Sequence, residues 1–264
     1  HINMETFVLD NDAIGYKFAD ALIAKQREGV QVNLIYDSVG TLYTPQHFFD
    51  RMRANGINLL EFNPIKPSEV SQLLKLNQRD HRKLLIVDGE VAFVGGVNIS
   101  SVYSEGSSTG AYISQRRDPD DEDEDDHVFS GPIPWRDTHI RLIGPVVNDF
   151  QRMFLATWEN QKGEPLAKRN YLPTLAKRGE QVVRAIGSSP EDEFSLIYVT
   201  LLSAINSAAT HVYLTNAYFV PDPQFLQSLK DAVARGVDVK LILPSKTDSN
   251  LVFYASRSYY TELL

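Results

Sequence analysis

The sequence predicts an α/β fold in which helices flank a mixed β-sheet. Segments typical of strands and of helices alternate through the first 62 residues, and a similar alternation returns from about residue 211 onward. Alternation of this kind is typical of a layered sheet with helices packed on its faces. The 264 residues are 43% hydrophobic and 23% charged, which is ordinary for a soluble globular chain with a sizeable core.

The opening segments follow one another as strand, helix, strand, helix and strand. The first helix is expected to begin at the capping residues of "DND", to place Ile14, Phe18 and Leu22 at helical spacing, and to end at Gly29. A second helix is closed by the glycine of "TPQHFFDRMRANG". The three strands are expected in "INMETFVL", "VQVNLIYD" and "INLLEF".

A β-hairpin is expected in "DHRKLLIVDGEVAFVGGVNIS", residues 80–100. Asp88 and Gly89 lie between two apolar runs, which favours a two-residue type I′ turn that pairs Val87 with Glu90. His81 lies seven residues before Asp88, or roughly 23 Å along an extended strand at ~3.3 Å per residue. Asp88 is therefore expected to build the turn and not to contact the imidazole.

The predicted hairpin brings four residues to one face. Counting back from the turn places His81 opposite Gly96, and alternation along each strand puts Lys83 and Asn98 on the same side. Gly96 has no side chain, so it is expected to leave room for a ligand beside His81. Gly95 is expected to relieve packing. Alternatively, His81 and Lys83 belong to a solvated strand edge and Asn98 to a turn.

These residue types suit phosphodiester chemistry. A neutral imidazole can attack phosphorus and form a phosphohistidine, while an ammonium and an amide NH₂ stabilise the developing negative charge. A nucleophilic histidine needs an acceptor on its other ring nitrogen, and the candidate is Asp137 in "WRDTHIRL". Asp137 could instead be a plain surface residue, and its neighbour His139 is expected to be structural. A second histidine is needed to protonate the leaving oxygen.

No metal or cofactor is required by this chemistry. The acidic run at 118–126 lies in a polar, Gly/Ser/Pro-rich stretch at about 104–134, which is expected to be a mobile hydrated loop and not a metal site. The chain has no cysteine, which excludes disulfides and thiolate metal sites. No stretch approaches the ~20 apolar residues that span a bilayer, and no signal peptide is evident. Because the chain opens directly on a strand, an upstream portion is expected to be missing.

An internal repeat is indicated by a constant offset of 207 residues. Residues 1–165 are expected to form a first repeat, 166–180 a linker, and 181–264 the start of a second repeat. The counterpart of His81 would lie near position 288, so the second repeat is expected to be incomplete. The offset pairs Phe18, Leu22, Gly29, Val30, Leu34 and Ile35 with Phe225, Leu229, Gly236, Val237, Leu241 and Ile242.

The quoted segments resemble a known family. "HRKLLIVD" with "GGVNIS" is similar to the HKD motif of the phospholipase D superfamily, and "WRDTHIRLIGPVVNDFQRMFLATW" resembles the segment that follows it in bacterial cardiolipin synthases and related enzymes. "YFVPD" and "RGVDVKLILPSKTDSNLVFYASRSYYTELL" resemble the start of their second half. The resemblance therefore covers nearly the whole chain and implies a phospholipase D-like layered fold.

The resemblance also implies site residues. His81 would be the nucleophile, Lys83 and Asn98 would bind phosphate, and an acidic residue at the place of Asp137 would hydrogen-bond the nucleophile. Most members of the family use no metal. Tyr218 and Phe219 would line the substrate cleft. Members normally combine two halves, each giving one histidine, so a homodimer or a further C-terminal half is expected to complete the site.

The implied activity is phosphatidyl transfer of the cardiolipin synthase type on a phosphatidylglycerol-like phospholipid. Three alternatives stay open: a phospholipase D-type hydrolase, a phosphodiesterase or nuclease, and an incomplete half-site that only binds phosphate or lipid. A net charge of −8 gives no general attraction to nucleic acid, so none is expected as a partner. The expected location is a peripheral one at the cytoplasmic membrane face of a bacterium, although the N-terminal spans usual in cardiolipin synthases are absent.

Overall fold

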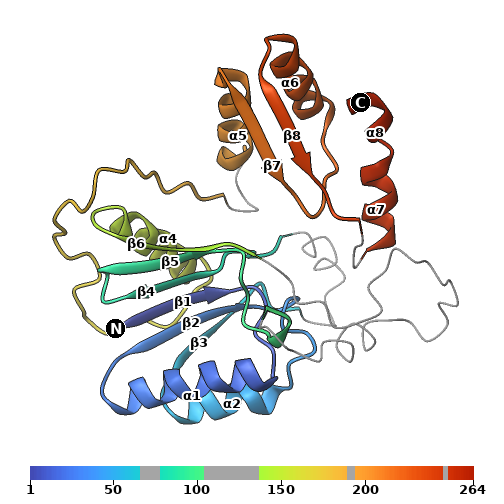
Figure 1. Cartoon of the computed structure of the whole chain (residues 1–264). Helices are drawn as coiled ribbons and strands as arrows, with labels where there is room; N and C mark the ends of the chain where they lie inside the picture. Colours follow the sequence, from blue (N-terminus) through green and yellow to red (C-terminus); the bar gives the residue numbers. More distant parts are fainter. Residues whose placement is uncertain (66–77, 104–136, 189–193, 246–248) are drawn as a thin grey trace, which may run out of the picture. The chain divides into compact units, whose positions relative to one another are not determined.

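The computed structural model describes residues 1–65, 78–103, 137–188, 194–245 and 249–264. The chain divides into two compact units, which are described separately: His1–Ser107 with Pro134–Asp192, and Ser108–Ile133 with Glu193–Leu264 (Figure 1). The acidic loop predicted at 104–134 lies outside the described residues.

The first unit is built on a six-stranded mixed sheet in the order β3-β2-β1-β4-β5-β6 (Figure 1). Three strands are parallel, and the other three continue the sheet in antiparallel fashion. The predicted α/β fold with a mixed sheet is therefore confirmed. The strands are β1 (Ile2–Thr6), β2 (Val32–Asp37), β3 (Asn58–Phe62), β4 (Leu84–Val87), β5 (Val91–Gly95) and β6 (His139–Ile143).

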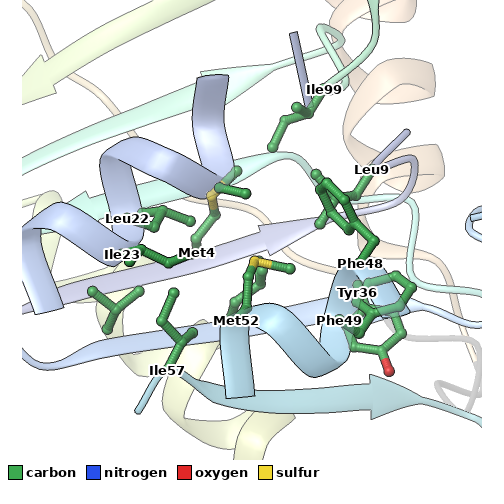
Figure 2. Packing of buried hydrophobic residues seen from close by; sticks show 13 residues of the cluster. Met4, Leu9, Leu22, Ile23, Tyr36, Phe48, Phe49, Met52, Ile57 and Ile99 are labelled. Carbon is green, nitrogen blue, oxygen red and sulfur yellow. The ribbon is translucent and has the colours of Figure 1, made fainter. Parts of the chain in front are cut away.

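Helices cover both faces of this sheet (Figure 1). On one face, α1 (Ala13–Arg27) and α2 (Gln46–Ala54) pack on the parallel strands. On the other face, α4 (Val147–Asn160) packs on β1, β4 and β5. Figure 2 shows the first of the two cores, in which Met4, Leu22, Phe48 and Met52 are buried together. The second core includes Ile35, Ile86, Phe154 and Trp158.

The start of α1 is fixed by Asp12. Its side chain accepts hydrogen bonds from the N–H groups of Ile14 and Gly15, as the capping residues predicted. The predicted apolar stripe is partly wrong, because Phe18 is 39% exposed while Ala19 is buried. A Cβ at Gly15 would lie only 1.6 Å from the carbonyl oxygen of Asp10, so the start of the helix approaches the preceding residues closely.

The register of the parallel strands is fixed by an asparagine ladder whose members Asn3 and Asn33 are buried. Asn3, Asn33 and Asn58 lie opposite one another on β1, β2 and β3. Asn33 donates to Asn3 at 2.7 Å and Asn58 donates to Asn33 at 2.8 Å, while Asn3 donates to Gln151 of α4 at 2.9 Å. A shift of one residue would leave the buried amides of Asn3 and Asn33 unpaired, which is costly.

The predicted hairpin forms, but its pairing is shifted. Asp88 and Gly89 have positive φ angles of 54° and 69°, and Glu90 N–H donates to the carbonyl of Val87 at 3.0 Å, as a type I′ turn requires. The strands then pair Val87 with Val91, so the predicted pairing of Val87 with Glu90 is wrong. Glu90 is an extra residue that moves the whole ladder by one position.

The segment between α4 and the second unit runs along the first unit without regular structure. Leu166 and Leu175 pack against the second core, and Trp158 donates from its ring to the carbonyl of Glu164 at 2.9 Å. Asn148 of α4 donates to the carbonyl of Pro173 at 3.0 Å. The residues proposed as a linker, 166–180, therefore contribute to the packing of the first unit.

The second unit is built on two strands, β7 (His211–Thr215) and β8 (Asp238–Ile242), which pair in parallel. The helix α6 (Pro223–Ala234) connects them along the chain. This unit repeats the order of β1, α1 and β2. Gly29 and Gly236, which the 207-residue offset relates, both follow their helix with positive φ angles of 87° and 85°. The other helices are α5 (Leu196–Ser207), α7 (Asn250–Arg257) and α8 (Tyr260–Leu263). Within the described residues, no helix has the length and apolar character to span a membrane.

Replacing Asp12 should destabilise the first unit. Partial burial raises the pKa of Asp12, but hydrogen bonds from the N–H groups of Gly15, Ser101 and Ile14 outweigh it and hold the pKa below 3.8. Asp12→Ala should lower the free energy of unfolding by about 1–2 kcal/mol at pH 7. The depressed pKa means that the fold stabilises the ionised carboxylate of Asp12. The difference in unfolding free energy between wild type and Asp12→Ala should therefore shrink as the pH falls below about 4. Urea unfolding at pH 7 and pH 3 measures both, with Asp12→Asn, which keeps an acceptor oxygen, as the control.

Candidate active site

The candidate site lies where strands of opposite direction meet, along the edge of the sheet that is formed by strand ends. β1 and β2 end at this edge, and β4 begins there, because Leu84 of β4 pairs with Glu5 near the end of β1. The residues just before β4 therefore arrive beside the end of β1. The same edge holds the end of β5 and the start of β6. His81 and Lys83 lie here, at the opposite end of β4 from Asp88.

Phe7 joins His81 and Lys83. The rings of Phe7 and His81 are 4.6 Å apart between centroids, and the Nζ of Lys83 lies 5.1 Å from the centroid of Phe7. Lys83 Nζ also donates to the carbonyl oxygen of His81 at 2.6 Å. Lys83 is buried, with 4% of its surface exposed, whereas His81 is exposed. The imidazole is thus accessible while the ammonium beside it is held in place.

The pKa values of Lys83 and His81 are both lowered at this site. Burial lowers the pKa of Lys83 to about 8, against the opposing effect of Asp80, Asp137 and Asp37. Desolvation and the nearby charge of Lys83 lower the pKa of His81, while Asp80 and Asp137 raise it. Near neutral pH, Lys83 is therefore mainly charged and His81 mainly neutral, which suits a nucleophile beside an anion-binding group.

The two glycines at the end of β5 allow the segment that leads into β6 to approach β5 closely. A Cβ at Gly95 would lie 2.2 Å from the carbonyl oxygen of Thr138, and a Cβ at Gly96 would lie 2.0 Å from Oδ1 of Asp137. The space beside Gly96 is thus filled by the carboxylate of Asp137, and the prediction that it leaves room for a ligand is wrong. Lys83 lies opposite Gly95, whose N–H donates to the Lys83 carbonyl at 3.4 Å.

Asp137 lies close enough to act on His81 electrostatically, but not through the predicted hydrogen bond. Its Oδ1 accepts the N–H of Thr138 at 2.8 Å. No hydrogen bond joins Asp137 to the His81 ring in the part of the chain that the structure describes. His139, next on β6, is exposed at the strand edge, and its pKa is lowered by desolvation and raised by Asp137.

Asn98 fastens the end of β1 to the segment after β5. Its Oδ1 accepts the N–H of Val8 at 3.0 Å, and its Nδ2 donates to the hydroxyl of Tyr103 at 2.9 Å. Tyr103 belongs to the short 3-10 helix η2 (Ser101–Tyr103). Because Val8 follows Phe7, these bonds fix the aromatic ring on which His81 and Lys83 pack. The role of Asn98 as a phosphate ligand stays a prediction.

Two of the remaining predicted residues lie at the other end of β4 from His81, and two belong to the second unit. Asp88 is in the hairpin turn, where the N-terminal amine contacts its carboxylate, and Gly89 packs against the carbonyl of Tyr171. Phe219 is 2% exposed in the core of the second unit, so its side chain is not available to line a cleft. Tyr218 is 48% exposed in that unit, and its role stays a prediction.

The sequence interpretation missed Phe7 and Asp80. Asp80 is buried, its N–H donates to Asp37 at 3.0 Å, and its charge acts on both His81 and Lys83. Their position follows from the β1–β4 pairing, which no local pattern indicates. The one available signal was the charge of Asp80 directly before His81.

An apolar cavity of about 370 Å³ adjoins Lys83. Ile14 and Phe18 of α1 line it together with Leu85 and Phe93 of the sheet. Its polar lining includes Lys83, Asn98, Tyr103 and His139. The size and mixed lining are typical of a site for an organic ligand. In the described part of the chain, no cluster of three or more His, Asp and Glu side chains could hold a metal ion.

Comparison with known proteins assigns the family. A family model described as "Cardiolipin synthase, PLD-like domain" matches residues 1–106 and 201–264. The chain belongs to this phospholipase D-like family. The matched residues of this phospholipase D-like chain include His81, Lys83 and Asn98, so the resemblance inferred from "HRKLLIVD" and "GGVNIS" is confirmed.

Relatives carry the same description. The cardiolipin synthase of Alkalihalophilus pseudofirmus is 34% identical over 100% of this chain, and that of Geobacillus kaustophilus is 33% identical. The chain spans 48% of each, and thus about half the length of the curated relatives it matches. The crystal structure of phosphatidylserine synthase from Haemophilus influenzae matches with a TM-score of 0.56 at 12% identity, over 92% of this chain and 56% of that one, which supports the fold.

The charges around His81 should shift its pKa in opposite directions. Asp137→Asn removes a negative charge and should lower the pKa of His81 by about 0.5–1 unit, whereas Lys83→Gln removes a positive charge and should raise it by a similar amount. NMR titration of the histidine ring protons measures both, with His81→Asn as the assignment. Asp149→Asn, on the exposed side of α4, is the matched control and should leave this pKa unchanged. Shifts of the same sign for Asp137→Asn and Lys83→Gln would contradict the arrangement.

Proposed function

We propose that this chain carries the nucleophilic half-site of a phosphatidyltransferase of the cardiolipin synthase type, with His81 as nucleophile. The observation that carries the proposal is the exposed, mainly neutral imidazole of His81 beside the buried ammonium of Lys83. The family and the relatives named cardiolipin synthase support the reaction class. Because those relatives are about twice as long, the activity is proposed for the product of the complete gene.

The proposed reaction has two displacements at phosphorus. A nitrogen of His81 attacks the phosphodiester, the N–P bond forms, and the ester bond to the leaving alcohol breaks. A second histidine, from another half-site, protonates the leaving oxygen. In the second step the hydroxyl of a phosphatidylglycerol loses its proton to that base and attacks phosphorus, which breaks the N–P bond and frees His81.

Lys83 and Asn98 are the proposed phosphate ligands. The ammonium of Lys83 would stabilise charge on the equatorial oxygens, once the phosphate displaces its contact with the His81 carbonyl. Asp137 is proposed to accept a hydrogen bond from the His81 ring, since it already acts on His81 electrostatically. Tyr218 is proposed to contact substrate from the second unit.

The apolar cavity beside Lys83 supports a lipid over a water-soluble phosphodiester. Its lining by Ile14, Phe18, Leu85 and Phe93 would accept part of an acyl chain while the phosphate lies at Lys83. An acyl chain leaves no polar group unpaired against such a lining, whereas the sugars and phosphates of a nucleic acid do. A phospholipid substrate requires contact with a membrane surface, which we propose is peripheral for this part of the chain.

A hydrolase is the alternative that the same site allows. If water takes the place of the second alcohol, the phosphohistidine is hydrolysed and the product is phosphatidic acid. Incubation of the complete gene product with phosphatidylglycerol and, separately, with a single-stranded oligonucleotide distinguishes the classes. Release of glycerol with cardiolipin supports the transferase, phosphatidic acid supports the hydrolase, and oligonucleotide cleavage supports the nuclease. Binding of phospholipid without turnover supports a half-site that only binds.

A covalent intermediate on His81 should be trapped. Brief incubation of the complete gene product with phosphatidylglycerol labelled at phosphorus, followed by rapid denaturation, should leave an acid-labile, alkali-stable label on the protein, as expected of an N–P bond. His81→Asn should abolish the label. His47→Asn, on the exposed side of α2, is the matched control and should retain it. Label that persists in His81→Asn would exclude His81 as the nucleophile.

A charge in the apolar cavity should act on lipid but not on small phosphodiesters. Phe18 is 39% exposed at the cavity, so Phe18→Asp should be tolerated by the fold. Turnover of long-chain phosphatidylglycerol should fall about tenfold, since an acyl chain in the cavity would desolvate the new carboxylate. Cleavage of bis(p-nitrophenyl) phosphate should be unchanged. Ala24→Asp adds the same charge at an exposed position of α1 outside the cavity lining. Equal loss in both variants would remove the cavity from substrate binding.

A further inference from the structure

A buried cluster of two carboxyl groups and one arginine lies directly behind the His81 segment. Glu5 of β1 is 0% exposed and Asp80 is 5% exposed. Arg82 donates from Nη1 to Oε1 of Glu5 at 3.2 Å, and its backbone N–H donates to Oδ1 of Asp80 at 3.1 Å. Arg82 also donates to Thr157 of α4 at 2.6 Å. One guanidinium therefore faces two acids, and full ionisation would leave an excess negative charge in the interior.

The second oxygen of each acid lacks a donor. Glu5 Oε2 and Asp80 Oδ2 are both buried, and neither accepts a hydrogen bond within the described residues. The guanidinium of Arg82 joins the two acids, with Nη1 3.2 Å from Oε1 of Glu5 and Nε 3.9 Å from Oδ1 of Asp80. Asp80 also acts on Glu5 through its charge and a side-chain hydrogen bond. A single proton between them would supply the donor that both oxygens lack, whereas two carboxylates would leave two unpaired acceptors and repel each other.

We propose that Glu5 is a neutral carboxylic acid near pH 7, that it donates its proton to Asp80, and that through Asp80 it acts as a positioning residue for His81. In this arrangement Asp80 keeps one negative charge beside Arg82. Glu5 and Asp80 hold one proton between them, and the cluster as a whole is electrically neutral.

The surroundings of Glu5 favour this state. Burial raises the pKa of Glu5 well above 4.5, the charge and hydrogen bond of Asp80 raise it further, and Arg82 and Thr157 oppose them. Other charged groups at this edge are Lys83 before β4, Asp37 at the end of β2 and Asp137 before β6. Arg79 lies 3.8 Å from Asp37. From α4, the contact is the uncharged hydroxyl of Thr157.

The proton on Glu5 limits the negative charge behind His81. Asp80 already raises the pKa of His81, and a second carboxylate at Glu5 would add to that effect. More of the imidazole would then be protonated and unable to attack phosphorus. This consequence rests on the proposed function of His81, but the shared proton does not.

NMR titration of His81 tests the charge of Glu5 in the folded chain. Glu5→Gln exchanges a neutral acid for a neutral amide that can still donate to Asp80, so the pKa of His81 should change by less than about 0.2 unit. Asp80→Asn removes a charge and should lower that pKa by about 0.5–1 unit. A lowering in Glu5→Gln as large as in Asp80→Asn would show that Glu5 is ionised and would overturn the proposal.

Infrared spectroscopy tests the proton directly. The wild-type chain at pH 7 should show the carbonyl stretching band of a protonated carboxyl group, and Glu5→Gln should lose it, while any band from the buried Asp37 persists. If Glu5→Gln does not fold, the band is followed by pH titration in Asp80→Asn, where loss of the acceptor charge should move its midpoint to lower pH. An unchanged spectrum in Glu5→Gln, or an unmoved midpoint in Asp80→Asn, overturns the proposal. Absence of label on His81 would instead remove the proposed function and leave the shared proton intact.

Discussion

The antiparallel pairing of β4 with β1 is the constraint on which the first unit depends. β1 pairs in parallel with β2 on one side and antiparallel with β4 on the other, so it is the strand at which the sheet changes direction. This change brings the residues that enter β4 to the ends of β1 and β2. His81 and Lys83 consequently pack on Phe7, and the N–H of Asp80 reaches Asp37. A purely parallel sheet would have separated these groups.

Burial at this edge lowers the pKa of both Lys83 and His81, yet Lys83 stays charged and His81 stays neutral near pH 7. An ammonium loses hydration when it is buried, and the carboxylates of Asp80, Asp137 and Asp37 offset part of that cost for Lys83. With a pKa of about 8, Lys83 still carries its charge near neutral pH. The same charge repels a proton from His81, which stays mainly neutral. Desolvation first, and the charge of Lys83 second, therefore keep His81 neutral, and each carboxylate added to the edge would oppose both.

The sequence predicted the elements and the motif better than the contacts between them. The alternation of strands and helices, the cap at Asp12 and the turn at Asp88 depend on local preferences that are readable from a few neighbouring residues. Glu90 shifts the strand pairing by one residue. This shift was not predicted, because a single extra residue in the turn does not change the apolar pattern of the strands. The contact of Asp137 with Gly96 and the bond of Asn98 to Val8 join distant segments, so they were out of reach of spacing arguments.

A strand–helix–strand frame recurs in both units, and in the first unit the strands that follow this frame carry the candidate site. β1, α1 and β2 have their counterparts in β7, α6 and β8, with the same parallel pairing and the same glycine after the helix. Among the described residues, β7 pairs only with β8, whereas β1 also pairs with β4. His81, Lys83 and Asp137 all belong to the antiparallel half that β1 recruits. The strand–helix–strand frame is common to both units. The candidate site of the first unit therefore depends on the pairing of β4 with the other side of β1.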